Sequence, residues 1–334
     1  MSAVHWGLIG ATVIGREWMI GAIREAGGEI AAVMSTDAAR GRAYADEFGI
    51  PLAATSLHNL FAAGIDAVYI ATTNERHRAE TVAAAQAGIH VLCEKPLATS
   101  LADAHAMVAS CEKAGVVMAS NHHLRNSATF AAMRDLIKAG SIGRPLSARV
   151  VHAGYLPPHL HGWRLTSPSA GAGAILDLTV HDADLLRFIL DDEPEAITTL
   201  SQNGGLAAEG IEDAALSLLR FRSGLLAHLF EGFTTKYVET GVEVHGADGS
   251  LVARNCMAQT PGGTLVLRTV SGEAAIALDH QNYYTRGVRR FHDAIAGKGA
   301  PAVSGRDGVI SLAVALCALE SARTGRLTAI DAGV

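Results

Sequence analysis

A lysine, a histidine and an aspartate stand in positions that suit the reduction of a carbonyl group. Lys95 lies in a Glu-Lys-Pro run that follows the apolar stretch 89–93, and Asp177 precedes His181 by four residues. That spacing places two side chains on one face of an α-helix. A carboxylate beside an imidazole orients it for proton transfer, and an ammonium group stabilises an oxygen that gains negative charge. The three residues could therefore assist hydride transfer to a carbonyl carbon.

Each of these residues also has a structural interpretation. An isolated Glu-Lys-Pro run is usually an ordinary turn, and an acid such as Asp177 is favoured in the first turn of a helix. The element before Lys95 gives more information. Residues 89–93, bounded by Gly88 and Pro96, are predicted to form a buried parallel strand. Ligands of open α/β sheets bind beyond the carboxyl ends of the strands, so Glu94 and Lys95 are expected at that edge.

Length and composition favour a two-domain globular α/β protein. The chain has 334 residues, of which 49% are hydrophobic and 18% charged. A net charge of −6 gives no electrostatic basis for binding nucleic acid or an anionic membrane. No apolar run reaches the length of a membrane span and no signal peptide is evident, so a cytoplasmic protein is expected. The four cysteines show no Cys-x-x-Cys spacing, which indicates buried free thiols.

The N-terminus predicts a nucleotide-binding unit. Residues 4–9 read as a strand, and Gly10-Ala11-Thr12-Val13-Ile14-Gly15 and an amphipathic helix follow. This order is typical of a dinucleotide-binding turn, although Thr12 replaces the middle glycine. Gly10 allows the tight turn, and Thr12 could offer its hydroxyl to the pyrophosphate at the helix N-terminus.

The end of the second strand, residues 29–34, indicates NADP rather than NAD. The acidic residue that usually binds the ribose hydroxyls is replaced by Ser35 and Thr36, and Arg40 follows one turn later. Two hydroxyls and an arginine suit a 2′-phosphate. The alternative is that Thr36 caps the next helix and Arg40 is solvated. Asp37 and Gly15 leave room for some use of NADH.

Alternation of strands and helices continues to residue 123. A strand at 66–71 precedes the loop of Thr72, Thr73, Asn74, Glu75, Arg76 and His77, and a strand at 116–120 ends at Asn121. This pattern predicts a doubly wound parallel sheet, a Rossmann domain over residues 1–123. Polar residues gather after its strands, where a nicotinamide would lie. The adjacent His122 and His123 are a poor metal site, and no metal is expected.

Residues 124–334 are predicted to form an α+β domain with a large, mostly antiparallel, open-faced sheet. A helix (127–139) leads into a long strand (146–155), an aromatic and basic loop at 157–164, and the helix that carries Asp177 and His181. Hairpin signals then join 214–221 to 225–231, 241–245 to 251–252, and 264–270 to 273–278. Helices at 283–296 and 307–324 close the chain. The open face is available to substrate or to a partner subunit.

Taken together, the glycine turn, Glu94-Lys95-Pro96 and the Asp177…His181 helix resemble the Gfo/Idh/MocA oxidoreductase family over essentially the full chain. The resemblance implies that an NADPH-dependent enzyme reduces a cyclic keto-sugar, with His181 as general acid, Lys95 polarising the oxygen and Asp177 positioning sugar and imidazole. Gly15 departs from it, because alanine is favoured there.

The resemblance also implies a set of cofactor contacts. Ala11, Thr12, Val13 and Ile14 would face the pyrophosphate, and Ser35, Thr36 and Arg40 the 2′-phosphate. Thr72 to His77, Glu94, Lys95 and Asn121 would surround the ribose and nicotinamide, and Trp163, Arg164 and Tyr284 would reach the cofactor from the second domain. Two alternatives stay open: an NAD(P)-dependent sugar or inositol dehydrogenase of the same fold, and a non-catalytic NADP-binding regulator.

Overall fold

The computed structural model describes residues 3–334 and divides the chain into two compact units. The first unit extends to His123 and also contains residues 282–309, and the second comprises residues 124–281 and 310–334. The chain thus leaves the first unit at the predicted boundary. Residues 282–309, which sequence analysis assigned to the second domain, pack with the first unit instead.

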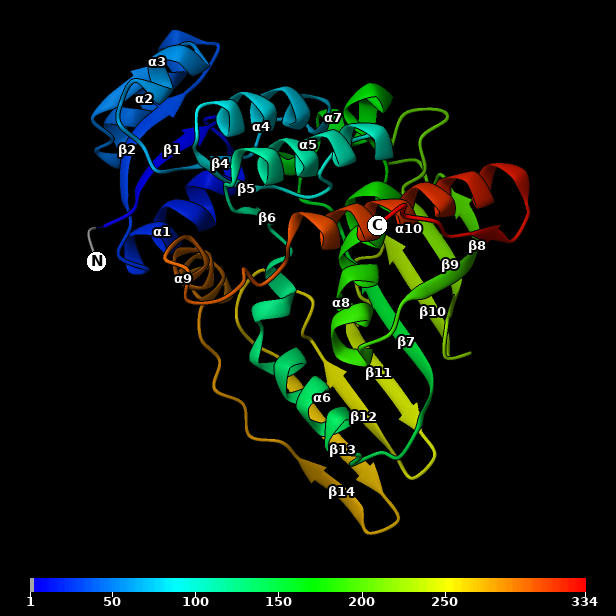
Figure 1. The fold of residues 1–334 in the computed structure, drawn as a ribbon. Helices are drawn as coiled ribbons and strands as arrows, with labels where there is room; N and C mark the ends of the chain where they lie inside the picture. The colour runs from blue at the N-terminus through cyan, green and yellow to red at the C-terminus, as the bar shows by residue number, and fades with distance from the viewer. Residues whose placement is uncertain (1–2) are drawn as a thin grey trace. The chain divides into compact units, whose positions relative to one another are not determined.

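The first unit is built on a six-stranded parallel sheet in the order β3-β2-β1-β4-β5-β6 (Figure 1). Every neighbouring pair runs parallel, and the chain crosses between strands through helices, as the doubly wound prediction requires. The strands are β1 (His5–Ile9), β2 (Glu29–Met34), β3 (Leu52–Ala54), β4 (Ala67–Ile70), β5 (His90–Cys93) and β6 (Met118–Ser120).

The helices of this unit alternate with its strands. A π-helical turn, η1 (Gly15–Met19), leads into α1 (Ile20–Glu25), and a 3-10 turn lies at η2 (Asn74–Arg76). The 3-10 turn η3 (His123–Asn126) begins at the last residue of this segment and continues into the second unit. The others are α2 (Ala38–Phe48), α3 (Leu57–Phe61), α4 (His77–Gln86), α5 (Leu101–Ala114) and α9 (Tyr283–Ile295).

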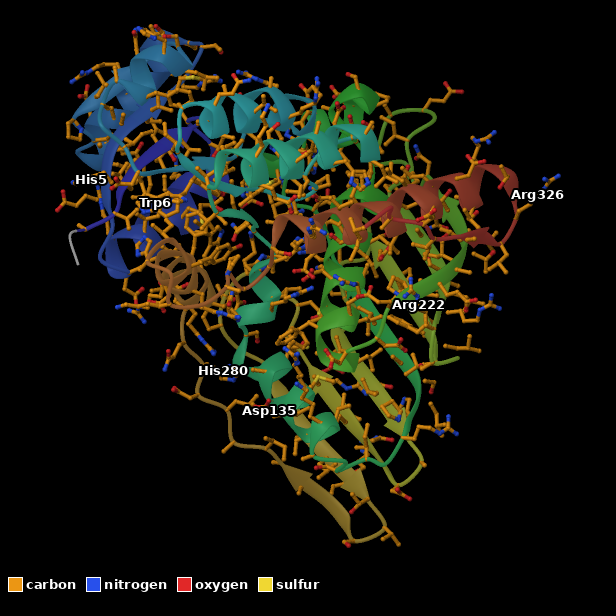
Figure 2. All side chains as sticks on the ribbon, in the orientation of Figure 1. His5, Trp6, Asp135, Arg222, His280 and Arg326 are labelled. Atoms are coloured by element: carbon orange, nitrogen blue, oxygen red, sulfur yellow. The ribbon has the colours of Figure 1, made fainter. Side chains whose placement is uncertain are left out.

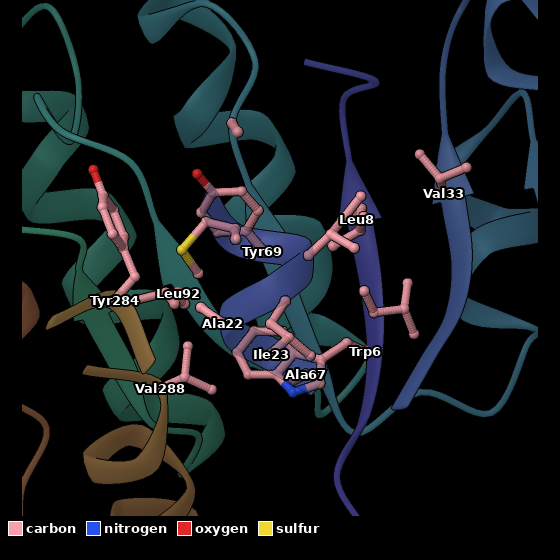
Figure 3. Packing of buried hydrophobic residues seen from close by; sticks show 14 of the residues in the cluster. Trp6, Leu8, Ala22, Ile23, Val33, Ala67, Tyr69, Leu92, Tyr284 and Val288 are labelled. Carbon is pink, nitrogen blue, oxygen red and sulfur yellow. The ribbon is translucent and has the colours of Figure 1, made fainter. Parts of the chain in front are cut away.

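Helix α9 joins the first unit because its apolar side completes that unit's core. Trp6 on β1 is fully buried, while its neighbour His5 is partly exposed (Figure 2). The Trp6 indole packs on Phe291 with ring centroids 5.4 Å apart, and its Nε1 donates to His292 Nε2 at 3.0 Å. Figure 3 shows Tyr284 and Val288 of α9 in the same cluster as residues of α1 and the sheet. The free energy gained by burying these large apolar side chains holds α9 in the first unit, although α9 is distant from that unit in sequence.

The second unit is built on a nine-stranded sheet in the order β14-β13-β12-β11-β7-β10-β9-β8-β15. All pairs are antiparallel except β7 with β10, so the mostly antiparallel prediction is confirmed. The strands are β7 (Pro145–Ala153), β8 (Pro194–Gln202), β9 (Ala214–Phe221), β10 (Leu226–Gly232), β11 (Gly241–Gly246), β12 (Gly249–Arg254), β13 (Thr264–Thr269), β14 (Gly272–Ala275) and β15 (Thr328–Ala329).

One face of this sheet carries α6 (Ala128–Lys138) and α8 (Val180–Leu190) (Figure 1). The opposite face exposes large apolar side chains, including Leu200, Leu216 and Leu218. Helix α10 (Gly305–Thr324) crosses the boundary between the two units in sequence.

Two local expectations were wrong. The helix that carries Asp177 does not begin as an α-helix, because a π-helical turn, η6 (Ile175–Thr179), precedes α8. The segment 157–164 is not an irregular loop but contains the short helical pieces η4 (Pro158–Leu160) and α7 (Trp163–Thr166), with η5 (Pro168–Ala170) after them. Strand β8 was not predicted at all.

The cysteines are free thiols: Cys93, Cys111 and Cys256 are buried and Cys317 is partly exposed. Within residues 3–334, no helix is both long and apolar enough to cross a membrane.

Candidate active site

The glycine turn after β1 has the geometry of a dinucleotide-binding turn. Gly10 takes a φ of 110°, which favours glycine, and its N–H donates to Met34 O at 3.0 Å. Thr12 Oγ1 accepts a hydrogen bond from Gly15 N at 3.3 Å, so its hydroxyl is engaged at the start of the helix. The backbone amides of this turn lie at the N-terminus of the helix, where an anionic group is favoured.

Gly15 leaves room for a tyrosine from the next helix. A Cβ at residue 15 would lie 2.7 Å from Tyr44 Oη, closer than a van der Waals contact allows. The Tyr44 hydroxyl instead donates to Thr12 O at 3.1 Å, and burial raises the Tyr44 pKa. The departure at Gly15 is therefore part of how α2 packs on the glycine turn.

Ser35 and Arg40 lie against one another at the end of β2. Arg40 Nε donates to the buried Ser35 Oγ at 3.2 Å, while the arginine remains exposed. Asp37, not Thr36, caps α2, because its Oδ1 accepts from Arg40 N at 3.0 Å. Thr36 is thus exposed and does not cap the helix.

The loop after β4 is supported from beneath by buried polar residues. Thr72 Oγ1 donates to Glu80 Oε2 at 2.5 Å, and Arg76 Nη2 lies 3.0 Å from Glu80 Oε1. His77 is fully buried, with Nδ1 3.1 Å from Pro96 O and Nε2 3.1 Å from Thr72 O. Its ring therefore holds the Thr72 loop to the loop after β5. That placement does not suit the direct cofactor contact predicted for His77.

Glu94 ties the carboxyl ends of three strands together. Its Oε1 accepts from Tyr69 Oη at 2.7 Å and from Asn121 Nδ2 at 2.6 Å, and Lys95 N donates to Oε2 at 3.3 Å. Burial raises the pKa of the Glu94 carboxyl, and the hydrogen bonds from Tyr69 and Asn121 oppose that rise. Predicted cofactor residues from β5 and β6 are thus brought together at the binding edge of the sheet.

Lys95 follows at the same edge. Its side chain is partly exposed, and the bond to Pro96 is cis. The residue stands directly after β5, where a ligand of an open parallel sheet is expected.

Tyr284 lies in the first unit and not, as predicted from the sequence, in the second domain. It belongs to the first unit, is 2% exposed, and stacks between Trp18 at a centroid distance of 5.5 Å and His123 at 4.7 Å. The expectation that Tyr284 reaches the cofactor from the second domain is therefore wrong. Asn282 starts α9 by accepting from the Tyr284 and Thr285 amides, which directs the tyrosine into the first core.

In the second unit, the helix of His181 is anchored by an acid. Glu212 Oε1 accepts from Ile175 N at 3.1 Å, at the first turn of η6. A Cβ at Gly173 would lie 2.1 Å from the same oxygen, so only glycine leaves space for Glu212 there. Burial raises the Glu212 pKa, and the Ile175 hydrogen bond opposes that rise.

Asp177 and His181 remain near one end of this helix despite the π-helical turn between them. Asp177 is partly exposed, and Arg164 Nε lies 3.4 Å from its Oδ2. His181 is 6% exposed. Arg164, predicted as a cofactor contact, is thus placed beside Asp177, and its guanidinium lies over the Trp163 ring at 4.6 Å.

Beneath His181 lies a polar cluster that sequence reasoning missed. His152 Nδ1 is 2.7 Å from Asp182 Oδ1, and Thr179 Oγ1 donates to Glu231 Oε2 at 2.6 Å. Asp182 and Glu231 are fully buried. The sequence of β10 contained a signal for this cluster. Glu231 alternates with Ala227 and Leu229 on the buried face of the strand, where an acid is unusual.

A second missed contact is the ion pair of Arg125 with Asp184. Arg125 Nε lies 2.7 Å from Asp184 Oδ2, with the aspartate side chain 1% exposed. The pair joins η3 to α8 within the second unit. The sequence signal for this pair was Asp184, an acid about one turn after His181. An acid near the start of a helix can also be explained by its interaction with the helix dipole, so the signal was ambiguous.

The first unit fits a nicotinamide dinucleotide. The cradle at Gly10 would be filled by a Cβ, which would meet Thr12 Cγ2 at 2.9 Å, and the glycine turn leads into a helix N-terminus, where a phosphate is favoured. Among residues 3–334, no group of three His, Cys, Asp or Glu side chains is arranged to hold a metal ion.

Comparison with known proteins agrees with this arrangement. Residues 4–122 match the family described as "Oxidoreductase family, NAD-binding Rossmann fold", and residues 130–252 match the "GFO/IDH/MocA C-terminal domain". The chain is 54% identical to the 1,5-anhydro-D-fructose reductase of Ensifer adhaerens over 331 residues, 99% of each protein. It is 27% identical to the myo-inositol 2-dehydrogenase of Thermotoga maritima over 86% of each.

A solved structure shares the fold over the same extent. An oxidoreductase from Agrobacterium radiobacter, crystallised with NAD+, L-tartaric acid and magnesium, superimposes with a TM-score of 0.84 at 26% identity, covering 99% of this chain and 98% of that one. Both domain matches and the full-length identity lead to one conclusion. The chain belongs to the Gfo/Idh/MocA family of oxidoreductases.

Proposed function

We propose that this protein reduces 1,5-anhydro-D-fructose to 1,5-anhydro-D-mannitol with NADPH. The observation that carries the proposal is the 54% identity to a 1,5-anhydro-D-fructose reductase across 99% of both chains. Identity at this level over the substrate unit as well as the nucleotide unit argues for the same keto-sugar.

The residues of this chain divide the work of carbonyl reduction. NADPH, when bound, supplies the hydride that reaches the carbonyl carbon. Lys95 supplies a positive charge for the carbonyl oxygen, and His181 donates a proton as that oxygen becomes an alkoxide. Asp177, held by Arg164, binds sugar hydroxyls and positions the imidazole of His181.

The preference for NADPH is supported by the end of β2. Arg40 and Ser35 are already hydrogen-bonded to each other, and Thr36 is exposed beside them. The nearest carboxylate, Asp37, accepts from the α2 backbone, which occupies it at the helix start. A guanidinium and hydroxyls favour a 2′-phosphate over free ribose hydroxyls.

The remaining proposed cofactor contacts follow the arrangement of each unit. The Thr72–Arg76 loop, Glu94 and Asn121 serve the ribose and nicotinamide, with His77 and Tyr284 as buried supports. Trp163, in the second unit, is a further proposed cofactor contact.

Loss of NADPH absorbance with 1,5-anhydro-D-fructose tests the proposal directly, with product stereochemistry determined by NMR. We expect turnover with formation of 1,5-anhydro-D-mannitol. Absence of turnover would remove this substrate assignment. Oxidation of myo-inositol in the reverse assay would favour a polyol dehydrogenase, the candidate supported by the 27% identity to such an enzyme. Tight NADP binding without turnover of either sugar would instead indicate a regulator.

A further inference from the structure

A second histidine lies on the inner face of the large sheet, under the helix of His181. His152 on β7 and Glu231 on β10 are register partners across the parallel strand pair. Parallel partners direct their side chains to the same face, and α8 covers this face and brings Asp182 to His152. Three elements that are distant in sequence therefore meet at one imidazole.

The two acids behind His152 are arranged to share a proton. Asp182 and Glu231 are both fully buried. Asp182 Oδ1 lies 2.7 Å from His152 Nδ1, and Glu231 Oε2 accepts from Thr179 Oγ1 at 2.6 Å. The other oxygens, Asp182 Oδ2 and Glu231 Oε1, are buried and would lack partners if both acids were ionised. Burial and the nearby Asp182 charge raise the pKa of Glu231 well above its usual range. This shift favours the protonated form of Glu231.

Asp182 is the acid that faces His152. Asp182 Oδ1 accepts from His152 Nδ1, as the buried aspartate of a histidine–aspartate pair does. The contact fixes the tautomer and orientation of the ring. Nε2 is then the nitrogen that exchanges protons with its surroundings.

His152 also neighbours the proposed acid. The ring centroids of His152 and His181 are 5.9 Å apart, with planes inclined by 56°. The His152 side chain is 15% exposed, whereas His181 is 6% exposed. At this separation one water molecule can carry a proton between the rings, and His152, which is partly exposed, has the better access to solvent.

We propose that His152, oriented by the Asp182–Glu231 pair, returns a proton to His181 after each turnover. The inference rests on the proposed function, in which His181 protonates the product. Hydride reaches the carbonyl carbon, the oxygen takes the proton of the His181 imidazolium, and neutral His181 takes a proton from the His152 imidazolium. His152 then takes a proton from water or buffer, so that each cycle consumes one hydride and one solvent proton.

Pre-steady-state kinetics separate this relay from a role in the hydride step. In His152→Gln, the first turnover should keep its wild-type rate because His181 starts protonated, while steady-state kcat falls by at least about tenfold. The matched control is His245→Gln, because His245 on β11 also lies beside a carboxylate, 3.4 Å from Glu243, but outside the cluster. It should leave both phases unchanged.

Chemical rescue provides a readout that a structural role would not give. Added imidazole should restore steady-state kcat of His152→Ala in a concentration-dependent way without changing KM for NADPH. Equal slowing of first and later turnovers, unchanged kcat in His152→Gln, or no rescue by imidazole would each overturn the relay. If wild-type protein does not turn over 1,5-anhydro-D-fructose at all, the proposed function fails first, before any variant is compared.

Discussion

Glu231 on β10 stands beside His152 on β7, in register across the one parallel strand pair of the large sheet. Asp182 reaches the same place from α8, 2.7 Å from His152 Nδ1. Two carboxyls and an imidazole in a buried layer are costly unless their charges are arranged to compensate. Burial and the charge of Asp182 raise the pKa of Glu231 well above its usual range, which favours its protonated form and lowers the charge of this buried layer.

The two carboxyls of this pair should respond differently to amide substitution. Glu231→Gln keeps a donor toward Asp182 and an acceptor for Thr179, so kcat should remain within about threefold of wild type. Asp182→Asn removes the charge that faces His152, and kcat should fall by about tenfold or more. Steady-state assays with 1,5-anhydro-D-fructose measure both. Equal losses in the two variants would contradict a proton that resides on Glu231.

Lys95 and His181 should each be needed for the chemical step. Lys95→Ala and His181→Ala should lower kcat by on the order of 10²-fold or more, because each removes charge or a proton needed by the developing alkoxide. Lys113→Ala, an exposed lysine on α5, is the control and should retain wild-type kcat. Wild-type rates in either active-site variant would refute the corresponding role.

Arg40 should decide between the two nicotinamide cofactors. Arg40→Ala should reduce kcat/KM for NADPH by about tenfold or more and leave that for NADH nearly unchanged, because only NADPH carries the 2′-phosphate. Arg42→Ala serves as the matched control, since Arg42 lies on the same helix and pairs with Asp46. A wild-type preference for NADH, or equal losses with both cofactors in Arg40→Ala, would contradict the assignment.

Glu80 should make stability depend on pH. Burial raises its pKa from 4.5 to about 7, opposed by Thr72 and Arg76. The folded state thus binds this proton more tightly than the unfolded state, so the contribution is full below about pH 4.5 and is lost as pH rises through about 7. The shift corresponds to roughly 3 kcal/mol.

Urea unfolding of wild type and Glu80→Gln across this range measures the effect. The free energy of unfolding of the variant should rise relative to wild type as pH increases from about 5 to about 8, because the amide never ionises. Glu112→Gln, at an exposed position on α5, should show no such trend. A constant difference between wild type and Glu80→Gln would exclude Glu80 as the source.

Local features of the fold followed closely from the sequence. Strand Glu29–Met34 has the predicted bounds, because an apolar run acts on its own neighbours. The juxtaposition of Ser35 and Arg40 was predictable for the same reason, since five residues separate them across a strand end and a helix start.

Other features depended on contacts between distant residues. Helix α9 has a recognisable start at Asn282, but its place in the first unit depends on the fit of Phe291 and His292 to Trp6. The π-helical turn before His181 is another case. The amide of Ile175, at the first turn of η6, donates to the carboxylate of Glu212, which is distant in sequence.

By itself, then, the sequence determined the alternating strands and helices of the first unit, the hairpins of the second and the glycine turn. It also supplied the prediction that Lys95, Asp177 and His181 carry out carbonyl chemistry. These follow from periodicity and from turn residues, which act over a few positions. Tertiary structure alone decided which unit holds Tyr284 and that His152, Asp182 and Glu231 form one cluster. Burial and charge compensation act through space, and strand register and helix packing, rather than sequence spacing, bring such groups together.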